Sequence, residues 1–225
     1  IIRTDDITNL ADIDLNEVAE IEVLLNENFD ISVLQQLPKN KIRLVLPAVN
    51  RRVGVWKPLI EKLLAQGFCK WTIGNYWGRE VLPEKGIDLA FDAPLYMLNT
   101  QAVVMAKQMG ATRANLAAED TLANMQVLTR QAPLPMVLDI YADMPLFRSA
   151  ACIRTNECKV CPRGIRWLNL RKEGREYEAL SKDCQIMLFD KRPYCLSEYA
   201  QAINPAYYRV SFAYKKYTAS HAAAI

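Results

Sequence analysis

Between residues 21 and 145, short runs rich in β-branched and aromatic residues alternate with stretches of helical periodicity. We predict strands at 21–25, 42–49, 70–74, 88–93, 113–118 and 136–141. Amphipathic helices are predicted at 55–66, 100–109 and 121–130. The strands follow one another at intervals of about 20 to 25 residues, a spacing typical of βαβ units and a parallel sheet. This alternation predicts an α/β fold.

A doubly wound sheet and a TIM-barrel-like (β/α) repeat both fit this spacing. Six strands precede residue 145, and a seventh is predicted at 208–213. Because a full barrel needs eight strands, the sequence does not establish a complete barrel, and an incomplete one stays open. The predicted organisation is an acidic N-terminal segment (1–20), a barrel-like domain (21–145), a small irregular cysteine-rich lobe (146–200), and a last strand with its tail (201–225).

Composition excludes several classes of protein. Hydrophobic residues make up 51% of the chain and charged residues 24%, which is ordinary for a folded globular protein and excludes a disordered chain. No run of 18 apolar residues occurs, so we expect no membrane-spanning helix. The first residues lack the pattern of a signal peptide, which favours a cytoplasmic location. The one histidine, His221, argues against histidine-based chemistry.

Charge is distributed unevenly although the net charge is only +3. Residues 1–40 hold nine acidic side chains against Arg3 and Lys39, whereas residues 148–192 hold eleven basic side chains against six acidic ones. Two solvated faces of opposite sign are the simpler interpretation. The alternative is that the 148–192 segment forms a basic surface for a phosphate-bearing partner such as RNA.

Five of the six cysteines lie close together in the order Cys152-x5-Cys158-x2-Cys161-x22-Cys184-x10-Cys195. A C-x2-C pair on a loop lets two thiolates face one metal ion, and two further thiolates complete a four-sulfur set. Such sets bind zinc or iron–sulfur clusters. Zinc usually takes two C-x2-C pairs, and since only one is present here, the spacing favours a cluster. Buried free thiols and a redox-active pair are the alternatives.

Cys69 and Cys195 receive separate predictions. Cys69 falls at a predicted helix-to-strand junction and is expected in the core. Cys195 is expected to be a spare or alternate ligand.

No Gly-rich phosphate loop, G-x-S-x-G or H-E-x-x-H motif is present. In either α/β fold, functional groups lie at the carboxyl ends of the strands, where this sequence offers polar residues such as Asp92, Glu119 and Asp143.

Three motifs occur in a recognisable order. Residues 92–102 (DAPLYMLNTQA) lead into a helix, residues 109–119 (MGATRANLAAE) form the next strand and its end, and residues 142–146 (ADMPL) end the strand before Cys152. These stretches resemble the bacterial family of collagenase-like peptidases, peptidase family U32. Asn99, Arg113, Glu119, Pro145 and Leu146 occupy the positions of its motifs. The cysteine order and the final 208–212 run are also similar, and the match covers about residues 40–215.

The resemblance implies a barrel-like domain in which Cys152, Cys158, Cys161 and Cys184 hold a [4Fe-4S] cluster. It implies a part in oxygen-independent hydroxylation of an RNA pyrimidine or a quinone precursor, often by paired subunits. Asp92, Asn99 and Glu119 would line the catalytic pocket. The family's N-terminal barrel strands are not recognisable in this sequence, and residues 1–20 match nothing in it.

Two other interpretations stay open. The family name suggests a collagenase-like protease, which would cleave peptides without any metal. A zinc-stabilised binding or scaffold module without chemistry is the other, because four cysteines also suit a structural zinc site.

Overall fold

The computed structural model describes residues 1–50, 52–150, 164–182 and 184–215. The chain divides into two compact units, which are described separately. The first comprises residues 1–141 and 196–225, and the second comprises residues 142–195.

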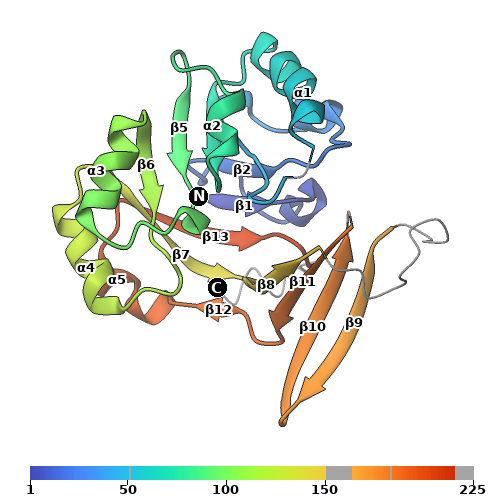
Figure 1. Cartoon of the computed structure of the whole chain (residues 1–225), viewed down its shortest axis with the longest axis vertical. Coiled ribbons are helices and arrows are strands. Elements are labelled where there is room, and N and C mark those ends of the chain that lie inside the picture. Colours follow the sequence, from blue (N-terminus) through green and yellow to red (C-terminus); the bar gives the residue numbers. More distant parts are fainter. Residues whose placement is uncertain (51, 151–163, 183, 216–225) are drawn as a thin grey trace. The chain divides into compact units, whose positions relative to one another are not determined.

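The first unit is a closed barrel of parallel strands (Figure 1). Around the barrel each strand is hydrogen-bonded to the next in parallel, and β13 closes it by pairing with β7 on one side and β1 on the other. The eight strands are β1 (Ile2–Thr4), β2 (Ile21–Leu24), β3 (Ile42–Val45), β4 (Lys70–Ile73), β5 (Asp88–Phe91), β6 (Ala111–Asn115), β7 (Met136–Ala142) and β13 (Tyr207–Phe212).

The predicted α/β barrel-like fold is confirmed, and the barrel, whose completeness the sequence left open, is closed by eight strands. All six predicted strands before residue 145 are present, and the run predicted at 208–213 is β13. The strand missing from the prediction is β1, which lies in the acidic opening of the chain. It has only three residues, Ile2–Thr4, and pairs with both β13 and β2. A three-residue strand is too short to show a periodic pattern.

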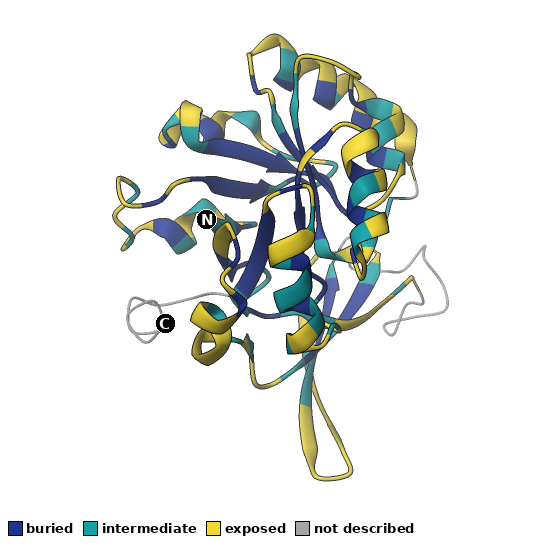
Figure 2. Cartoon of the chain, turned by 90° about the vertical axis from the view of Figure 1, so that its left-hand side faces the viewer, coloured by how far each residue is buried: buried dark blue, intermediate teal, exposed yellow. Residues whose placement is uncertain are grey.

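Helices α1 (Val53–Ala65), α2 (Trp77–Val81), α3 (Thr100–Gln108), α4 (Leu122–Gln131) and α5 (Ala200–Ile203) follow the later strands. The first two connections carry short 3-10 turns instead, at Ile7–Leu10, Ile31–Gln36 and Lys39–Lys41. Figure 2 shows the barrel strands as buried ribbons, with the exposed faces of the helices turned outward.

The hydrophobic core lies between the outer faces of the strands and the helices. Leu44 and Ile73 from the strands, and Ile60 and Leu63 from α1, are almost completely buried in it. Packing is tight where α2 meets β4, because a Cβ atom added to Gly78 would lie 2.5 Å from Ile73 Cγ2. In the part of the chain that the structure describes, no helix has the length and apolar character needed to cross a membrane.

The described part of the second unit is a regular four-stranded antiparallel sheet, in contrast to the irregular lobe expected from the sequence. The order across the sheet is β8 (Pro145–Ser149), β11 (Gln185–Asp190), β10 (Arg175–Lys182) and β9 (Arg166–Lys172). The short β12 (Tyr194–Cys195) follows. Strand β9 is exposed along most of its length. A strand with water on both faces has no alternation of apolar and polar residues, which explains why the sequence pattern did not reveal it.

Candidate functional site

The inward faces of the barrel strands carry charged side chains. Residues paired across parallel strands share a face, and the pairings place Arg3 beside Glu22, Glu22 beside Arg43, and Arg209 beside Asp139. In β2 and β3, the residues that flank Glu22 and Arg43 are apolar and face outward. Barrels of this kind are usually filled by branched aliphatic side chains. The lumen here is filled by buried ion pairs instead.

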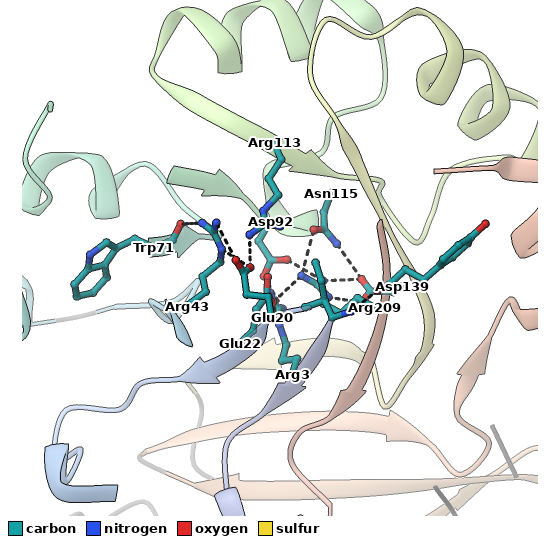
Figure 3. Close-up of polar contacts among 12 residues, drawn as sticks. Arg3, Glu20, Glu22, Arg43, Trp71, Asp92, Arg113, Asn115, Asp139 and Arg209 are labelled. Carbon is teal, nitrogen blue, oxygen red and sulfur yellow. Dashed lines mark hydrogen bonds and ion pairs between the residues drawn. The ribbon is translucent and has the colours of Figure 1, made fainter. Parts of the chain in front are cut away.

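Toward the carboxyl ends of the strands, the ion pairs form a cluster centred on Arg209 (Figure 3). Arg209 is 2% exposed, and its Nε and Nη2 donate to the two carboxylate oxygens of Asp139 at 2.6 and 2.7 Å. Nη1 donates to Glu22 and Asn115 at 3.0 and 3.2 Å, and Nη2 also donates to Asp92 at 3.0 Å. We call this set the Arg209 network, with members Arg3, Glu22, Asp92, Asn115, Asp139 and Arg209.

Arg3 supplies the second cation of the Arg209 network. Its Nε donates to Glu22 Oε2 at 2.7 Å and its Nη1 to Asp92 Oδ2 at 2.8 Å. Burial alone would raise the pKa of Asp92, but Arg3 and Arg209 hold that pKa well below its usual range. The pKa of Glu22 is lowered by the same two guanidinium groups against the same effect of burial. Both carboxylates are therefore ionised at neutral pH and fixed in position.

A second group of ion pairs lies at the amino ends of the strands, where Glu20 precedes β2 and where Lys70 and Asp88 begin β4 and β5. Arg43 donates from Nε to Glu20 at 2.6 Å and from Nη2 to Asp88 at 2.5 Å. Arg113 Nη2 also donates to Glu20, and Lys70 Nζ lies 3.7 Å from the same carboxylate. We call these five residues the Glu20 network. The Arg43 contacts and a hydrogen bond from Thr112 lower the pKa of Asp88, although partial burial opposes them.

The three predicted pocket residues lie in different settings at the carboxyl end of the barrel. Asp92 directly follows β5 and belongs to the Arg209 network. Asn99 is exposed and caps α3, since its Oδ1 accepts a hydrogen bond from the backbone N–H of Ala102 at 2.9 Å. Glu119 is exposed in the loop after β6. Among the described residues, no hydrogen bond or ion pair joins any two of these three.

The predicted cluster ligands are only partly described. Cys152, Cys158 and Cys161 lie outside the described residues. Cys184 is exposed at the turn between β10 and β11, where its φ of 56° is in the left-handed region. Cys69 was expected in the core, but it is exposed, because it follows the end of α1 at the surface before β4 begins.

In the second unit, the strand pairing places the ends of neighbouring strands at the same end of the sheet as Cys184. Ile186, two residues after Cys184, pairs with Ser149 at the end of β8. Arg166, at the start of β9, pairs with Ser181 near the end of β10. The end of β8 and the start of β9, which flank the three other predicted ligands in the sequence, therefore both lie at the Cys184 end of the sheet.

Five of the described basic side chains of the second unit lie at the opposite end of this sheet. Arg171, Lys172 and Arg175 are exposed on either side of the β9–β10 turn. Lys191 and Arg192 follow β11 and border the same shallow depression as Arg175. Lys191 is paired with Glu176 at 2.6 Å.

Comparison with known proteins adds no relative: no family model and no curated protein matches this chain. The likeness to the U32 family rests on the sequence motifs and the cysteine order alone.

Proposed function

We propose that this chain is a cytoplasmic iron–sulfur protein of the U32 type that takes part in the oxygen-independent hydroxylation of an RNA pyrimidine, with a quinone precursor as the alternative substrate. One observation carries the proposal. The end of β8, the start of β9 and the Cys184 turn all lie at the same end of the antiparallel sheet.

The covalent chain allows all four cysteines to reach one point. Cys152 comes three residues after Ser149, and Cys161 comes five residues before Arg166. An extended residue spans roughly 3.3–3.6 Å, and neighbouring strands lie about 4.8 Å apart. Three residues from Ser149 and five residues from Arg166 are therefore long enough, when extended, for Cys152 and Cys161 to reach the Cys184 turn. Four thiolates with one C-x2-C pair are a donor set that suits a [4Fe-4S] cluster.

The backbone at Cys184 has the left-handed conformation of a hairpin turn, as Glu173 at the β9–β10 turn also does with a φ of 53°. A φ of 56° is favoured by Gly, Asn and Asp, whereas other residues there are destabilised by roughly 1–2 kcal/mol. Cys184 is also exposed, so its sulfur is accessible to a cofactor.

The cluster would supply electron transfer, and the residues of the chain would bind and orient the substrate. Asp92 would act as a fixed anion at the carboxyl end of the barrel, because two guanidinium groups hold it ionised and a general base needs a pKa closer to neutral. Asn99 and Glu119 follow strands at the same end. The basic side chains Arg171, Lys172 and Arg175 would contact RNA phosphates, and such contacts weaken as salt is added.

The experiment is purification of the full chain without oxygen, followed by visible absorption and by iron, sulfide and zinc analysis. We expect a brown protein with broad visible absorption and about four iron atoms per chain. Cys184→Ser is expected to lose most of the iron and the absorption. Cys69→Ser is the matched control, since Cys69 is also exposed but lies in the first unit and has no predicted part in the cluster, and it is expected to keep both.

Two results would contradict the proposal. A colourless protein with one bound zinc would replace the cluster by a structural metal site and favour a scaffold. Equal iron contents in Cys184→Ser and the parent protein would remove Cys184 from the ligand set and with it the structural support for the assignment.

A further inference from the structure

A cavity of about 470 Å³ lies at the amino end of the barrel, opposite the end at which the proposed chemistry takes place. Its lining includes side chains from the first residues of the strands or from positions just before them: Glu20, Lys70, Asp88, Thr112, Arg113 and Tyr207. This volume lies within the range of small-molecule sites in proteins. Neither the Arg209 network nor the cysteine set explains it.

Arg113 brings an unused hydrogen-bond donor to this cavity. Its side chain is only 8% exposed, and its Nε has no hydrogen-bond partner among the residues that the structure describes. Two contacts hold the rest of the guanidinium group. Nη2 forms an ion pair with Glu20, and Cζ lies 5.1 Å from the centroid of the Tyr207 ring. A buried donor without an acceptor destabilises the protein, so a ligand that offers an acceptor there is favoured.

Lys70 adds a second donor at the rim of the cavity. Its Nζ donates to the backbone oxygen of Asn40 at 2.7 Å and lies 3.7 Å from Glu20. An ammonium group carries three N–H bonds, so capacity for a further acceptor remains. The side chains of Lys70 and Asp88 are 33% and 39% exposed, which gives the cavity access to solvent.

Two cations, Lys70 and Arg113, and two carboxylates, Glu20 and Asp88, line the cavity. Arg43 is not part of the lining, but it pairs with both carboxylates and so leaves the two lining cations available to an anion. The carboxylate of Glu20 already accepts from Arg43 and Arg113, and that of Asp88 accepts from Arg43 and Thr112. The Glu20 network contains three cations, namely Arg43, Lys70 and Arg113, and two carboxylates, which leaves one positive charge in excess. A group that offers several acceptor oxygens and one or two negative charges matches both the excess charge and the free donors.

We propose that this cavity binds a small oxyanion, the phosphate or carboxylate group of a small molecule, between Arg113 Nε and Lys70 Nζ. The remaining volume accommodates the body of that molecule. The site is independent of the cluster and of the substrate end of the barrel.

The test is isothermal titration of the full chain with inorganic phosphate and, separately, with acetate, at constant ionic strength set with chloride. We expect saturable binding and a rise in melting temperature with the concentration of the bound anion. The anion that binds more tightly identifies the ligand as phosphate-bearing or carboxylate-bearing. Lys70→Gln, which changes a partly exposed side chain, is expected to weaken binding about tenfold through loss of a charged donor.

Lys107→Gln is the matched control, because Lys107 is an exposed lysine on α3 with no contact to the cavity, and it is expected to bind as the parent does. Arg113→Lys is the second variant. It keeps the positive charge but removes Nε, and it is also expected to bind more weakly. The proposal is overturned if neither anion binds saturably, or if Lys70→Gln and Arg113→Lys both bind as tightly as the parent.

Discussion

The two charged networks inside the barrel are built mainly from arginine and carboxylate side chains, but they differ in burial and in how many of their hydrogen-bond donors have partners. In the Arg209 network, Arg209 and Glu22 are each 2% exposed, and Nε and Nη2 of Arg209 donate to the two carboxylate oxygens of Asp139. Arg3 Nη2 makes no hydrogen bond among the described residues, but it forms an ion pair with Glu22 Oε2 at 2.6 Å. In the Glu20 network, Lys70 is partly exposed and Arg113 keeps an unused donor beside a cavity. The comparison indicates that the first network replaces an apolar core, whereas the second retains capacity for a ligand.

The largest expected effect comes from removing the central cation of the closed network. Arg209→Met leaves Glu22, Asp92 and Asp139 buried with Arg3 as their only remaining cation in that network. Breaking a buried ion pair in this way destabilises proteins by roughly 3–5 kcal/mol. We expect a loss of that size in the free energy of unfolding, measured by urea denaturation followed through tryptophan fluorescence.

Arg113→Met is the matched variant in the Glu20 network. Glu20 then still has Arg43 and Lys70 as partners, and the change also removes the unpaired Nε. We expect a smaller loss of roughly 1–3 kcal/mol, in line with the loss of one charged hydrogen bond. If the two variants lost equal stability, the distinction between a closed and an open network would be wrong.

A second effect is expected in the dependence of stability on pH. The folded-state pKa values of Asp92 and Glu22 are lowered below those of the unfolded chain. The stability that they contribute is therefore fully present above the unfolded pKa of about 4 and is lost as the pH falls below it. Each group adds at most about 1.4 kcal/mol per pH unit to the slope of the free energy of unfolding.

Asp92→Asn tests this effect through urea denaturation at a series of pH values from 7 to 3. The variant is expected to be less stable than the parent at neutral pH but to lose less stability on acidification. Glu61→Gln, on the exposed side of α1, controls for the removal of one surface carboxylate. An acid slope in Asp92→Asn as steep as that of the parent would show that Asp92 does not carry this dependence.

The sequence predicts the fold better than the site, for physical reasons that particular residues show. The strands were recognisable because their outer faces are apolar, as in Leu44 and Ile73, and helices such as α1 have a matching apolar face. The same strands carry a charge at alternate positions, as Glu22 and Arg43 do, and this pattern indicated a polar lumen that we did not predict.

The members of the Arg209 network could not be assigned to one another from the sequence. Arg209 and Glu22 are separated by 187 positions, and only closure of the barrel through β13 and β1 brings them to 3.0 Å. Arg3 was missed with β1 itself. Asp92 was identified as a polar residue at the carboxyl end of a predicted strand and again in the motif that resembles the U32 family. The contacts that fix its charge come from β1 and β13, near the two ends of the chain.

The smallest expected effect distinguishes a helix cap from a substrate contact at the carboxyl end of the barrel. Asn99→Ala removes the acceptor for the Ala102 N–H at the start of α3, and the loss of such a cap destabilises proteins by about 1 kcal/mol. Asn99→Asp keeps an acceptor oxygen and is expected to unfold at nearly the same urea concentration as the parent. If Asn99 also contacts substrate, hydroxylation is lost in Asn99→Asp while stability is kept. Full activity in Asn99→Asp together with reduced stability in Asn99→Ala would limit Asn99 to the cap and leave Asp92 and Glu119 as the predicted residues at the substrate end.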